Sequence, residues 1–340
     1  MPLKDYFPKL SKKESLDSAE MAGAMESIVT GSAEDRDIEE FLILLREKGE
    51  TAHEIAAAAR VMRKHALKLS KNYPDLLDTC GTGADEHFTI NVSTLAAIVA
   101  ASAGVQVGKH GNRSVSSVCG SADLLELLGM KMDQPIPMIE ASIERVGFGF
   151  FFAPHFHPAT RFAMPARKRI KGKTLFNLLG PLSNPGGALH QLVGVYDKRW
   201  VTVFAEVLSE LGARKALVVY GMEGLDEISI SARTFVADLD RGHIRTYFLS
   251  PHDFGIAPSD LGALKCLTKE ASRESAQAVL EGSKGPKTDI VCLNAGAALY
   301  VAGKVKTIRE GVLLARELME SGEVQEKLEE IMSFSHRYEY

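Results

Sequence analysis

The sequence is poor in cysteine, has one tryptophan and contains no apolar run long enough to cross a bilayer. Its four cysteines, at positions 80, 119, 266 and 292, form no C-x-x-C pair and have no histidine at a zinc spacing, which argues against a disulfide framework and a structural zinc site. The longest apolar stretches, such as residues 95–104, fall well short of a membrane span, and residues 1–10 lack the apolar region of a signal peptide. We therefore expect reduced, unpaired thiols and a cytoplasmic protein.

A strong charge of one sign is also lacking, because 40 basic and 44 acidic residues leave a formal net charge of −4. So mild a charge argues against general binding to nucleic acid or to anionic membranes, although it permits a local basic pocket. With 45% hydrophobic and 25% charged residues, the composition is that of a folded globular protein. A length of 340 residues accommodates two domains or one large one.

The first 70 residues have the pattern of helices and no strand signal. Ser18 begins a helix with one apolar face, and Asp37 is placed to cap a second helix. Thr51, with Glu54 three residues later, is a capping box for an alanine-rich helix that runs to residue 69. This part of the chain is predicted to be a small all-helical domain.

After Pro74 the pattern changes to strands that alternate with glycine turns and helices, which is typical of an α/β domain with a central, mostly parallel sheet. The region 158–187, rich in proline, glycine and basic residues, is predicted to be a helical excursion or hinge outside the sheet. The predicted strands are 76–80, 105–108, 148–152, 216–220 and a hairpin of 234–239 with 244–249. The predicted helices are 93–103, 121–128 with Ser121 as its cap, 290–301 and 308–320.

A first candidate site follows the strand 76–80, in the segment from Asp78 to Asp85 and on to Asn91-Val-Ser-Thr94. A strand that ends in glycines before a helix presents free backbone N–H groups, and the helix dipole favours an anion there. The alternative is an ordinary turn whose glycines only relax the backbone. It is not a dinucleotide fingerprint, because Glu86 stands where the third glycine belongs, and no Walker A loop is present.

A second candidate site is the segment from Lys109 to Ser117, with Ser121 just after it. Lys109 and Arg113 accompany four serine hydroxyls directly after a predicted strand. A loop that only faces solvent has little reason to combine these residue types. Open α/β sheets bind ligands at this edge, and the combination suits a polyanion. A solvated loop is the alternative, and we favour phosphate binding.

The remaining candidate residues give weaker signals. Asp226 and Glu227 follow the strand 216–220 on a glycine loop and fit one or two magnesium ions, although adjacent carboxylates are often only solvated. His155 and His157 lack a third nearby ligand, so a structural role is favoured over a metal site. Arg167 lies in a basic cluster that is solvated surface by default, yet one arginine of it is suited to hold a substrate carboxylate.

Taken in order, these segments resemble the anthranilate phosphoribosyltransferase family over nearly the whole chain. The specific matches are Lys109-His-Gly-Asn-Arg-Ser-Val-Ser-Ser117 and Gly224-Leu-Asp-Glu227, supported by Asn91-Val-Ser-Thr94 and Phe176-Asn-Leu-Leu-Gly-Pro181. The resemblance implies a homodimer of two-domain subunits, with residues 1–72 and 160–188 as the small helical domain and 73–159 and 189–340 as the large one. It also implies Mg²⁺, one or two ions, as cofactor.

The resemblance further implies a role for each matching residue. Ser93, Asp226 and Glu227 would ligate magnesium. Gly81, Asn112 and Arg167 would contact anthranilate. Phosphoribosyl diphosphate would be bound by Gly81, Ala84, Asp85, Thr89, Asn91, Val92, Ser93, Thr94, Lys109, His110, Gly111, Asn112, Arg113, Ser114, Val115, Ser116, Ser117 and Ser121.

The chain departs from the family pattern inside the first glycine loop. Ala84 and Glu86 replace glycines, and Phe88 stands where a polar residue is common. Ile170-Lys171 replaces a usual Leu-Gly pair, and Tyr220 a usual histidine; neither change removes a named contact.

The implied reaction is transfer of the phosphoribosyl group to the amine of anthranilate with release of pyrophosphate. No general base stands in these motifs, and an aromatic amine is neutral at pH 7, so orientation and electrostatic stabilisation of the leaving group are expected to suffice. Two alternatives are a pyrimidine nucleoside phosphorylase of the same fold, whose Lys-His-Ser-Thr-Gly-Gly loop is absent here, and a non-catalytic relative that binds nucleic acid. The net charge and the Asp226-Glu227 pair argue against the second.

Overall fold

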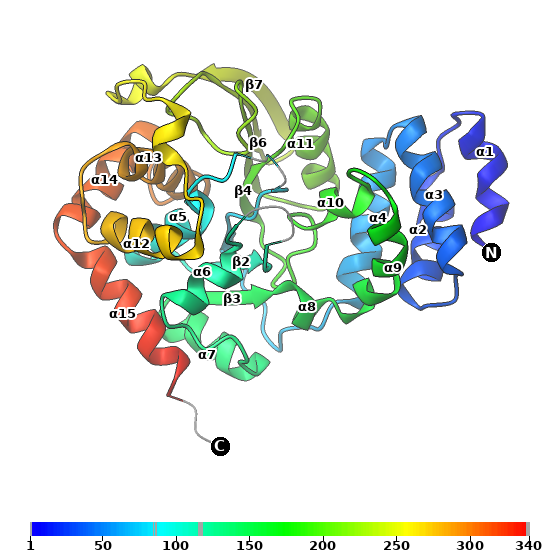
Figure 1. Cartoon of the computed structure of the whole chain (residues 1–340), viewed down its shortest axis with the longest axis horizontal. Coiled ribbons are helices and arrows are strands. Elements are labelled where there is room, and N and C mark those ends of the chain that lie inside the picture. The colour runs from blue at the N-terminus through cyan, green and yellow to red at the C-terminus, as the bar shows by residue number, and fades with distance from the viewer. Residues whose placement is uncertain (1, 84, 86, 115–117, 338–340) are drawn as a thin grey trace.

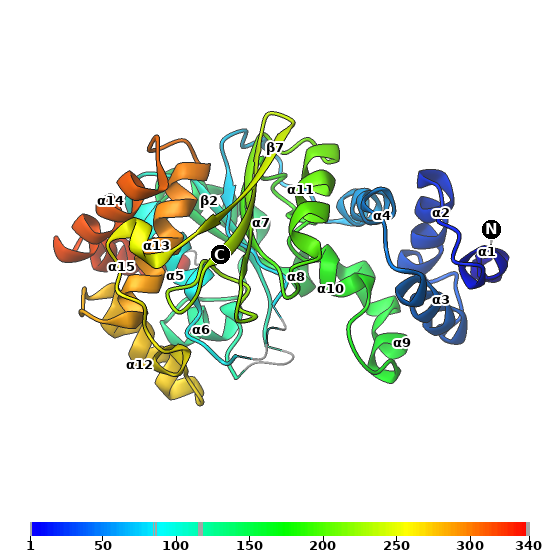
Figure 2. The ribbon, with the colours of Figure 1, turned by 90° about the horizontal axis from the view of Figure 1, so that it is seen from above.

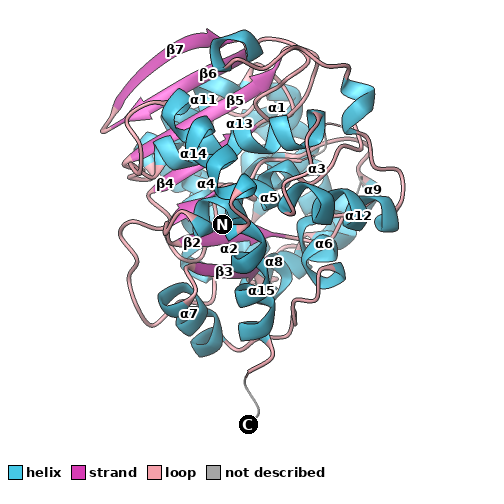
Figure 3. Ribbon diagram, turned by 90° about the vertical axis from the view of Figure 1, so that its left-hand side faces the viewer, coloured by secondary structure: helices cyan, strands magenta, loops and turns pink. Residues whose placement is uncertain are grey.

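The computed structural model describes residues 2–83, 85, 87–114 and 118–337, and in them one sheet of seven strands runs through the larger part of the molecule (Figures 1 and 3). The sheet order is β3-β2-β1-β4-β5-β6-β7. The strands are β1 (Leu77–Asp78), β2 (Val107–Gly111), β3 (Phe148–Phe152), β4 (His190–Gly194), β5 (Lys215–Gly221), β6 (Thr234–Asp240) and β7 (His243–Leu249).

The first five strands of this sheet are parallel, and β6 and β7 add an antiparallel hairpin at one edge. Strand β1 pairs with β2 on one side and with β4 on the other, so the direction in which the chain builds the sheet reverses between β1 and β4. In open α/β sheets, such a reversal opens a crevice at the carboxyl ends of the two strands, where ligands bind.

Helices cover both faces of the sheet. Successive strand residues point to opposite sides, so each inner strand contributes side chains to two cores. Leu192, Leu217 and Val219 enter a core with α5 and α13, whereas Val193 and Val218 enter a second core with α11. The helices of the large part are α5 (Val92–Ser102), α6 (Ser121–Leu127), α7 (Ile136–Arg145), α8 (Ala153–Phe156), α11 (Trp200–Glu210), α12 (Lys269–Leu280), α13 (Pro286–Val301), α14 (Ile308–Glu320) and α15 (Glu323–Ser335).

The remaining helices form a bundle at one end of the molecule (Figures 1 and 2). Two of them come from the predicted excursion and pack against α3 and α4 of the N-terminal segment. The second core continues from α11 into this bundle, which joins it firmly to one face of the sheet. These helices are α1 (Phe7–Ser11), α2 (Ser18–Val29), α3 (Asp35–Lys48), α4 (Ala52–His65), α9 (Met164–Arg169) and α10 (Leu175–Leu179).

The predicted fold class is confirmed, as are the capping box of Thr51 and Glu54 and the hairpin β6–β7. Two predicted caps are wrong. Asp37 lies in the first turn of a helix that begins at Asp35, and Gly120, not Ser121, is the N-cap of α6. Within the described residues no helix is long and apolar enough to cross a membrane.

Two predicted strands are displaced. The strand placed at 105–108 begins at Val107, because the N–H of Val105 still bonds to Ala100 at the end of α5. It continues to Gly111 because that stretch pairs with β3. Strand β1 ends at Asp78, whose carboxylate accepts the N–H of Cys80 and turns the chain.

Candidate active site

A cavity of about 530 Å³ lies at the carboxyl ends of β1, β2 and β5, next to the point where the sheet order reverses. Its walls come from the turn after β1, the N-terminus of α5, the loop between β2 and α6, the loop after β5, and α9 with α10. The described residues of both predicted phosphate segments therefore meet in one cavity. From the predicted set it is lined by Gly81, Asp85, Thr89, Asn91, Val92, Ser93, Thr94, Lys109, His110, Gly111, Asn112, Arg113, Ser114, Ser121, Arg167, Asp226 and Glu227. Ala84, Glu86 and residues 115–117 lie outside the described residues.

Asp78, a fully buried carboxylate at the end of β1, fixes the strand ends next to the cavity. It accepts the side-chain amide of Asn184 at 2.7 Å and the backbone N–H of His110 at 3.1 Å. The Asn184 amide also donates to the carbonyl of Gly108, so one residue ties the ends of β1 and β2 together. Burial raises the pKa of Asp78, and nearby Lys109 opposes that shift.

Three carboxylates gather on one side of the cavity. Asp226 accepts the backbone N–H of Gly83 at 2.8 Å, and Glu227 accepts the N–H of Ser93 at 3.2 Å. Burial raises the pKa of both carboxyl groups; repulsion from Asp85 raises that of Asp226 further, and repulsion from Asp226 and Asp85 raises that of Glu227. Such a group of oxygens, crowded and poorly hydrated, is stabilised by a divalent cation.

Two glycines make this arrangement possible. A Cβ on Gly81 would lie 3.2 Å from the carboxylate of Asp226, and a Cβ on Gly194 would lie 1.5 Å from the backbone oxygen of Asp226. Only a glycine at the end of β4 therefore lets the loop after β5 approach the turn after β1.

The cationic side of the cavity contains Lys109 and His110 in β2. Lys109 is buried, and its Nζ donates to the carbonyl of His110 at 3.1 Å. The imidazole of His110 contacts the carbonyl of Gly180 at 2.9 Å and lies 5.1 Å from the ring of His157, centroid to centroid. Burial lowers the pKa of His110 to about 4 and that of His157 to about 3, so both rings are neutral at pH 7.

The opposite wall is formed by α9 and α10 of the inserted segment. Arg167 lies 5.3 Å from the ring of Phe176, measured from Cζ to the centroid, and makes no ion pair with any carboxylate that the structure describes. Burial lowers the pKa of this arginine. A guanidinium that faces a cavity without a carboxylate partner suits an anionic ligand with a planar ring.

The sequence did not reveal two residues that shape the cavity, one of which lines it. Gly194 went unnoticed because β4 was not predicted, although a buried run before a glycine was its signal. Phe88, noted only as a departure, has a left-handed backbone (φ 55°), which is rare for a bulky residue. Its carbonyl accepts the N–H of Cys266 at 2.8 Å, and this contact holds Thr89 at the cavity wall.

Two other groups that resemble metal sites are better explained as structure. The ligand atoms of Asp78, Cys80 and His110 lie within 4.8 Å of one another. However, burial raises the pKa of the Cys80 thiol to about 12, and the Asp78 oxygens already accept hydrogen bonds. His155 is exposed, whereas His157 is buried, so these two histidines do not share a ligand position.

Comparison with known proteins matches both parts of the chain to family models. Residues 4–66 match the helical bundle domain of a glycosyl transferase family, and residues 73–325 match its α/β domain. The second match alone covers more than half of the 340 residues.

Two similar relatives are both named anthranilate phosphoribosyltransferase. The chain is 50% identical over 314 residues to the anthranilate phosphoribosyltransferase of Alkalilimnicola ehrlichii, covering 92% of this chain and 93% of the relative. It is 46% identical to that of Desulfatibacillum aliphaticivorans, with 97% and 98% covered.

Two solved structures of enzymes with this name superimpose on the chain over nearly its whole length. The crystal structure of the Thermus thermophilus enzyme of the same name superimposes with a TM-score of 0.92 at 43% identity, covering 97% of this chain and 99% of that one. The Saccharomyces cerevisiae enzyme, solved in complex with PRPP (phosphoribosyl diphosphate) and Mg, superimposes with a TM-score of 0.88 at 26% identity, covering 99% and 98%.

Proposed function

The chain belongs to the anthranilate phosphoribosyltransferase family, and from that premise we propose which part of its cavity binds each of two substrates. The activity is transfer of the 5-phosphoribosyl group from phosphoribosyl diphosphate to the amine of anthranilate with release of pyrophosphate. This is the second step of tryptophan biosynthesis from chorismate. The observation that carries our assignment of residues is that carboxylates and cations face one side of the cavity while Arg167 faces the other.

The sugar diphosphate is assigned to the side formed by the turn after β1, the N-terminus of α5 and the end of β2. The positive end of the α5 dipole and the ammonium of Lys109 are the groups that favour a diphosphate here. Thr89, Asn91 and Thr94 line the same wall and add polar contacts. The predicted contacts of Ala84 and of residues 115–117 remain predictions of sequence alone.

Magnesium use is supported by the relative solved with PRPP and Mg, and the residues present fit such an ion. Asp226, Glu227 and the hydroxyl of Ser93 supply only oxygen, which Mg²⁺ prefers, and Asp85 adds a fourth oxygen ligand nearby. When bound, the ion would neutralise the diphosphate that leaves. We propose one or two ions here.

Anthranilate is assigned to the wall of α9 and α10. Arg167 would bind its carboxylate in a bidentate manner, and Phe176 would pack against the ring. Asn112 and Gly81 line the same cavity, which suits a contact with either substrate.

The residues of the chain then act by orientation and electrostatics. Lys109 stabilises negative charge that develops on the diphosphate, and Arg167 directs the amine of anthranilate toward the ribose carbon. His110, neutral at pH 7 and bonded to a carbonyl, is placed as structure and not as a base. The aromatic amine attacks as a neutral nucleophile and releases its proton after the bond has formed.

Three broader expectations belong to the same proposal. We propose that residues 1–72 with 160–188 and residues 73–159 with 189–340 act as two domains about this cavity, that the protein is a homodimer, and that it works in the cytoplasm. Size-exclusion chromatography with light scattering checks the dimer. Fractionation of cells that express the protein checks its location.

The activity is tested by mixing the protein with magnesium, phosphoribosyl diphosphate and anthranilate. Anthranilate fluorescence should decay, and pyrophosphate should appear in equal amount. In a parallel reaction with phosphate and thymidine no thymine should form. Thymine formation without anthranilate consumption would instead identify a nucleoside phosphorylase, and strong salt-sensitive retention on heparin would reopen the nucleic-acid alternative.

A further inference from the structure

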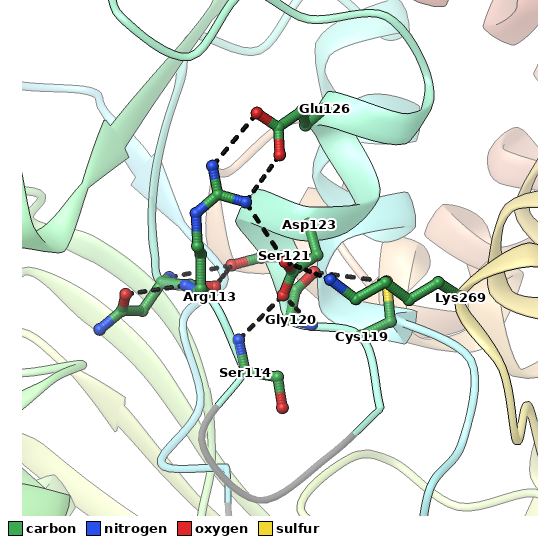
Figure 4. Close-up of polar contacts among 9 residues, drawn as sticks. Arg113, Ser114, Cys119, Gly120, Ser121, Asp123, Glu126 and Lys269 are labelled. Atoms are coloured by element: carbon green, nitrogen blue, oxygen red, sulfur yellow. Dashed lines mark hydrogen bonds and ion pairs between the residues drawn. The ribbon is translucent and has the colours of Figure 1, made fainter.

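Asp123, in the first turn of α6, makes contacts that the activity alone does not explain (Figure 4). One of its oxygens, Oδ2, accepts the backbone N–H of Ser114 and that of Gly120, each at 3.0 Å. The other, Oδ1, accepts Lys269 Nζ at 3.0 Å and Arg113 Nη1 at 3.3 Å. The side chain is 6% exposed and lies behind the cavity rather than in its wall.

The bond to Ser114 is the informative one. A residue at this position of a helix caps it by bonding the N-cap backbone, here Gly120, and needs no other partner. Asp123 additionally reaches across to Ser114, on the strand side of the loop that joins β2 to α6. One carboxylate oxygen therefore ties together two residues that line the sugar diphosphate side of the cavity.

The two ends of this loop are in direct contact at that place. A Cβ on Gly120 would lie 2.4 Å from the backbone nitrogen of Ser114. Ser121 Oγ accepts the N–H of Asn112 at 3.1 Å, so a second pair of bonds runs parallel to the first. Asp123 thus fixes Ser114 against Gly120, whereas Asn112 and Ser121 are held together by their own bond.

Lys269, a residue outside the loop, helps to keep the Asp123 carboxyl group ionised. Burial by itself would raise the pKa of this carboxyl, but the hydrogen bonds from Ser114, Lys269 and Gly120 outweigh burial and lower the pKa to about 2. Lys269 is the first residue of α12 and does not line the cavity. Its ammonium compensates the buried carboxylate without entering the cavity.

We propose that Asp123, assisted by Lys269, is a positioning residue for the sugar diphosphate, because it sets the spacing of the loop residues Ser114 and Gly120. This inference rests on the proposed function. It predicts that loss of the carboxylate weakens one substrate selectively, because Arg167 and the wall of α9 and α10 are held by other contacts.

The test is steady-state kinetics of Asp123→Asn. An amide that turns its oxygen to Ser114 and Gly120 must place its NH₂ against the ammonium of Lys269 and the guanidinium of Arg113, so Ser114 and Gly120 lose their shared acceptor. The KM for phosphoribosyl diphosphate should rise about 10-fold or more, as is usual when a residue that orients ligand-binding groups is changed, while the KM for anthranilate changes less than about twofold.

Rescue separates positioning from a general defect. Lys269→Met alone should raise the KM for phosphoribosyl diphosphate by only about threefold, because the carboxylate stays. In Asp123→Asn with Lys269→Met, only Arg113, the more distant donor at 3.3 Å, still faces the NH₂ group, so the KM should fall part of the way back toward that of Lys269→Met. Glu126→Gln is the matched control, because Glu126 bonds the same Arg113 at 2.6 Å but bonds no backbone group of the loop residues that the structure describes; it should behave as wild type.

Three results would overturn the inference: an unchanged KM in Asp123→Asn, equal changes for both substrates, or no recovery in the double variant. If Asp123→Asn does not fold, Lys269→Met decides, since an unchanged KM there contradicts the role of Lys269. A wild-type protein that does not bind phosphoribosyl diphosphate in calorimetry contradicts the proposed function instead, so the two failures are distinguishable.

Discussion

His110 and His157 illustrate how single buried residues set the acid stability of this protein. Their rings are in contact and burial lowers their pKa values to about 4 and about 3. In the unfolded chain an imidazole binds a proton below about pH 6.5. Between these values the unfolded state binds more protons than the folded state, so stability is fully present at pH 7 and decreases as the pH falls.

We predict that each of the two histidines costs on the order of 2 kcal/mol of stability at pH 5 relative to pH 7. In His157→Gln, the loss in unfolding free energy between these two pH values should therefore be smaller by about 2 kcal/mol than in wild type. Urea unfolding at both pH values measures it. His155→Gln, an exposed neighbour, should retain the wild-type loss, and an unchanged loss in His157→Gln would contradict the assignment.

At this scale much of the candidate site could be predicted, because phosphate and magnesium chemistry demands recognisable residue types. Lys109, Asp226 and Arg167 each stood out by charge and by place after a strand or in a basic cluster. Gly194 and Asp123 did not, because their importance depends on which segments the fold brings together: the first must leave room for Asp226, and the second reaches across a loop.

Among the elements, α4 depends on one buried ion pair. Glu54, fully buried, accepts Lys48 Nζ at 2.7 Å, the N–H and hydroxyl of Thr51, and the N–H of Leu16. The pair therefore caps α4 and joins it to the segment before α2. Removing one charge of a buried pair leaves the other without compensation, which costs about 3–5 kcal/mol.

We predict that Glu54→Gln lowers the free energy of unfolding by about 3 kcal/mol, measured by urea denaturation, since the amide keeps some of the hydrogen bonds. Glu47→Gln, on the exposed side of α3, should change it by less than about 0.5 kcal/mol. Adding Lys48→Met to Glu54→Gln should recover part of the loss. A loss no greater than that of Glu47→Gln would show that the pair is not stabilising.

The elements that sequence predicted and those that it missed differ in a physical way. Hydrophobic runs bounded by glycines, such as β3 and the hairpin β6–β7, were located because local pattern is sufficient for them. Strand β1 has only two residues, and its limits depend on a turn made by the Asp78 carboxylate. Strand β4, His190–Gly194, carries polar residues that tertiary contacts bury, such as Gln191, which donates to Pro181 at 2.8 Å.

For the molecule as a whole, the position of the cavity accounts for coupling between ligand binding and stability. Its walls come from both faces of the sheet and from the helical bundle, so a ligand there bridges segments far apart in sequence. A ligand that binds only the folded state stabilises it by mass action, by about 2.7 kcal/mol at 100 times its dissociation constant.

We predict that phosphoribosyl diphosphate raises the unfolding temperature in the presence of magnesium and that removal of magnesium with a chelator abolishes most of this increase. Glu227→Gln should lose the increase as well. Glu223→Gln, in the same loop but bonded to Ser229 outside the cavity, should keep it. An increase that survives both the chelator and Glu227→Gln would contradict a magnesium site at these carboxylates.

The central claim is that one cavity holds the sugar diphosphate on its carboxylate and lysine side and the aromatic acid on the side of α9 and α10. The KM of each substrate in Arg167→Ala tests it most directly, with the exposed neighbour Lys168→Ala as control. We predict an increase of at least about 10-fold in the KM for anthranilate, with the KM for phosphoribosyl diphosphate within about twofold of wild type. Equal increases for both substrates would contradict the division of the cavity.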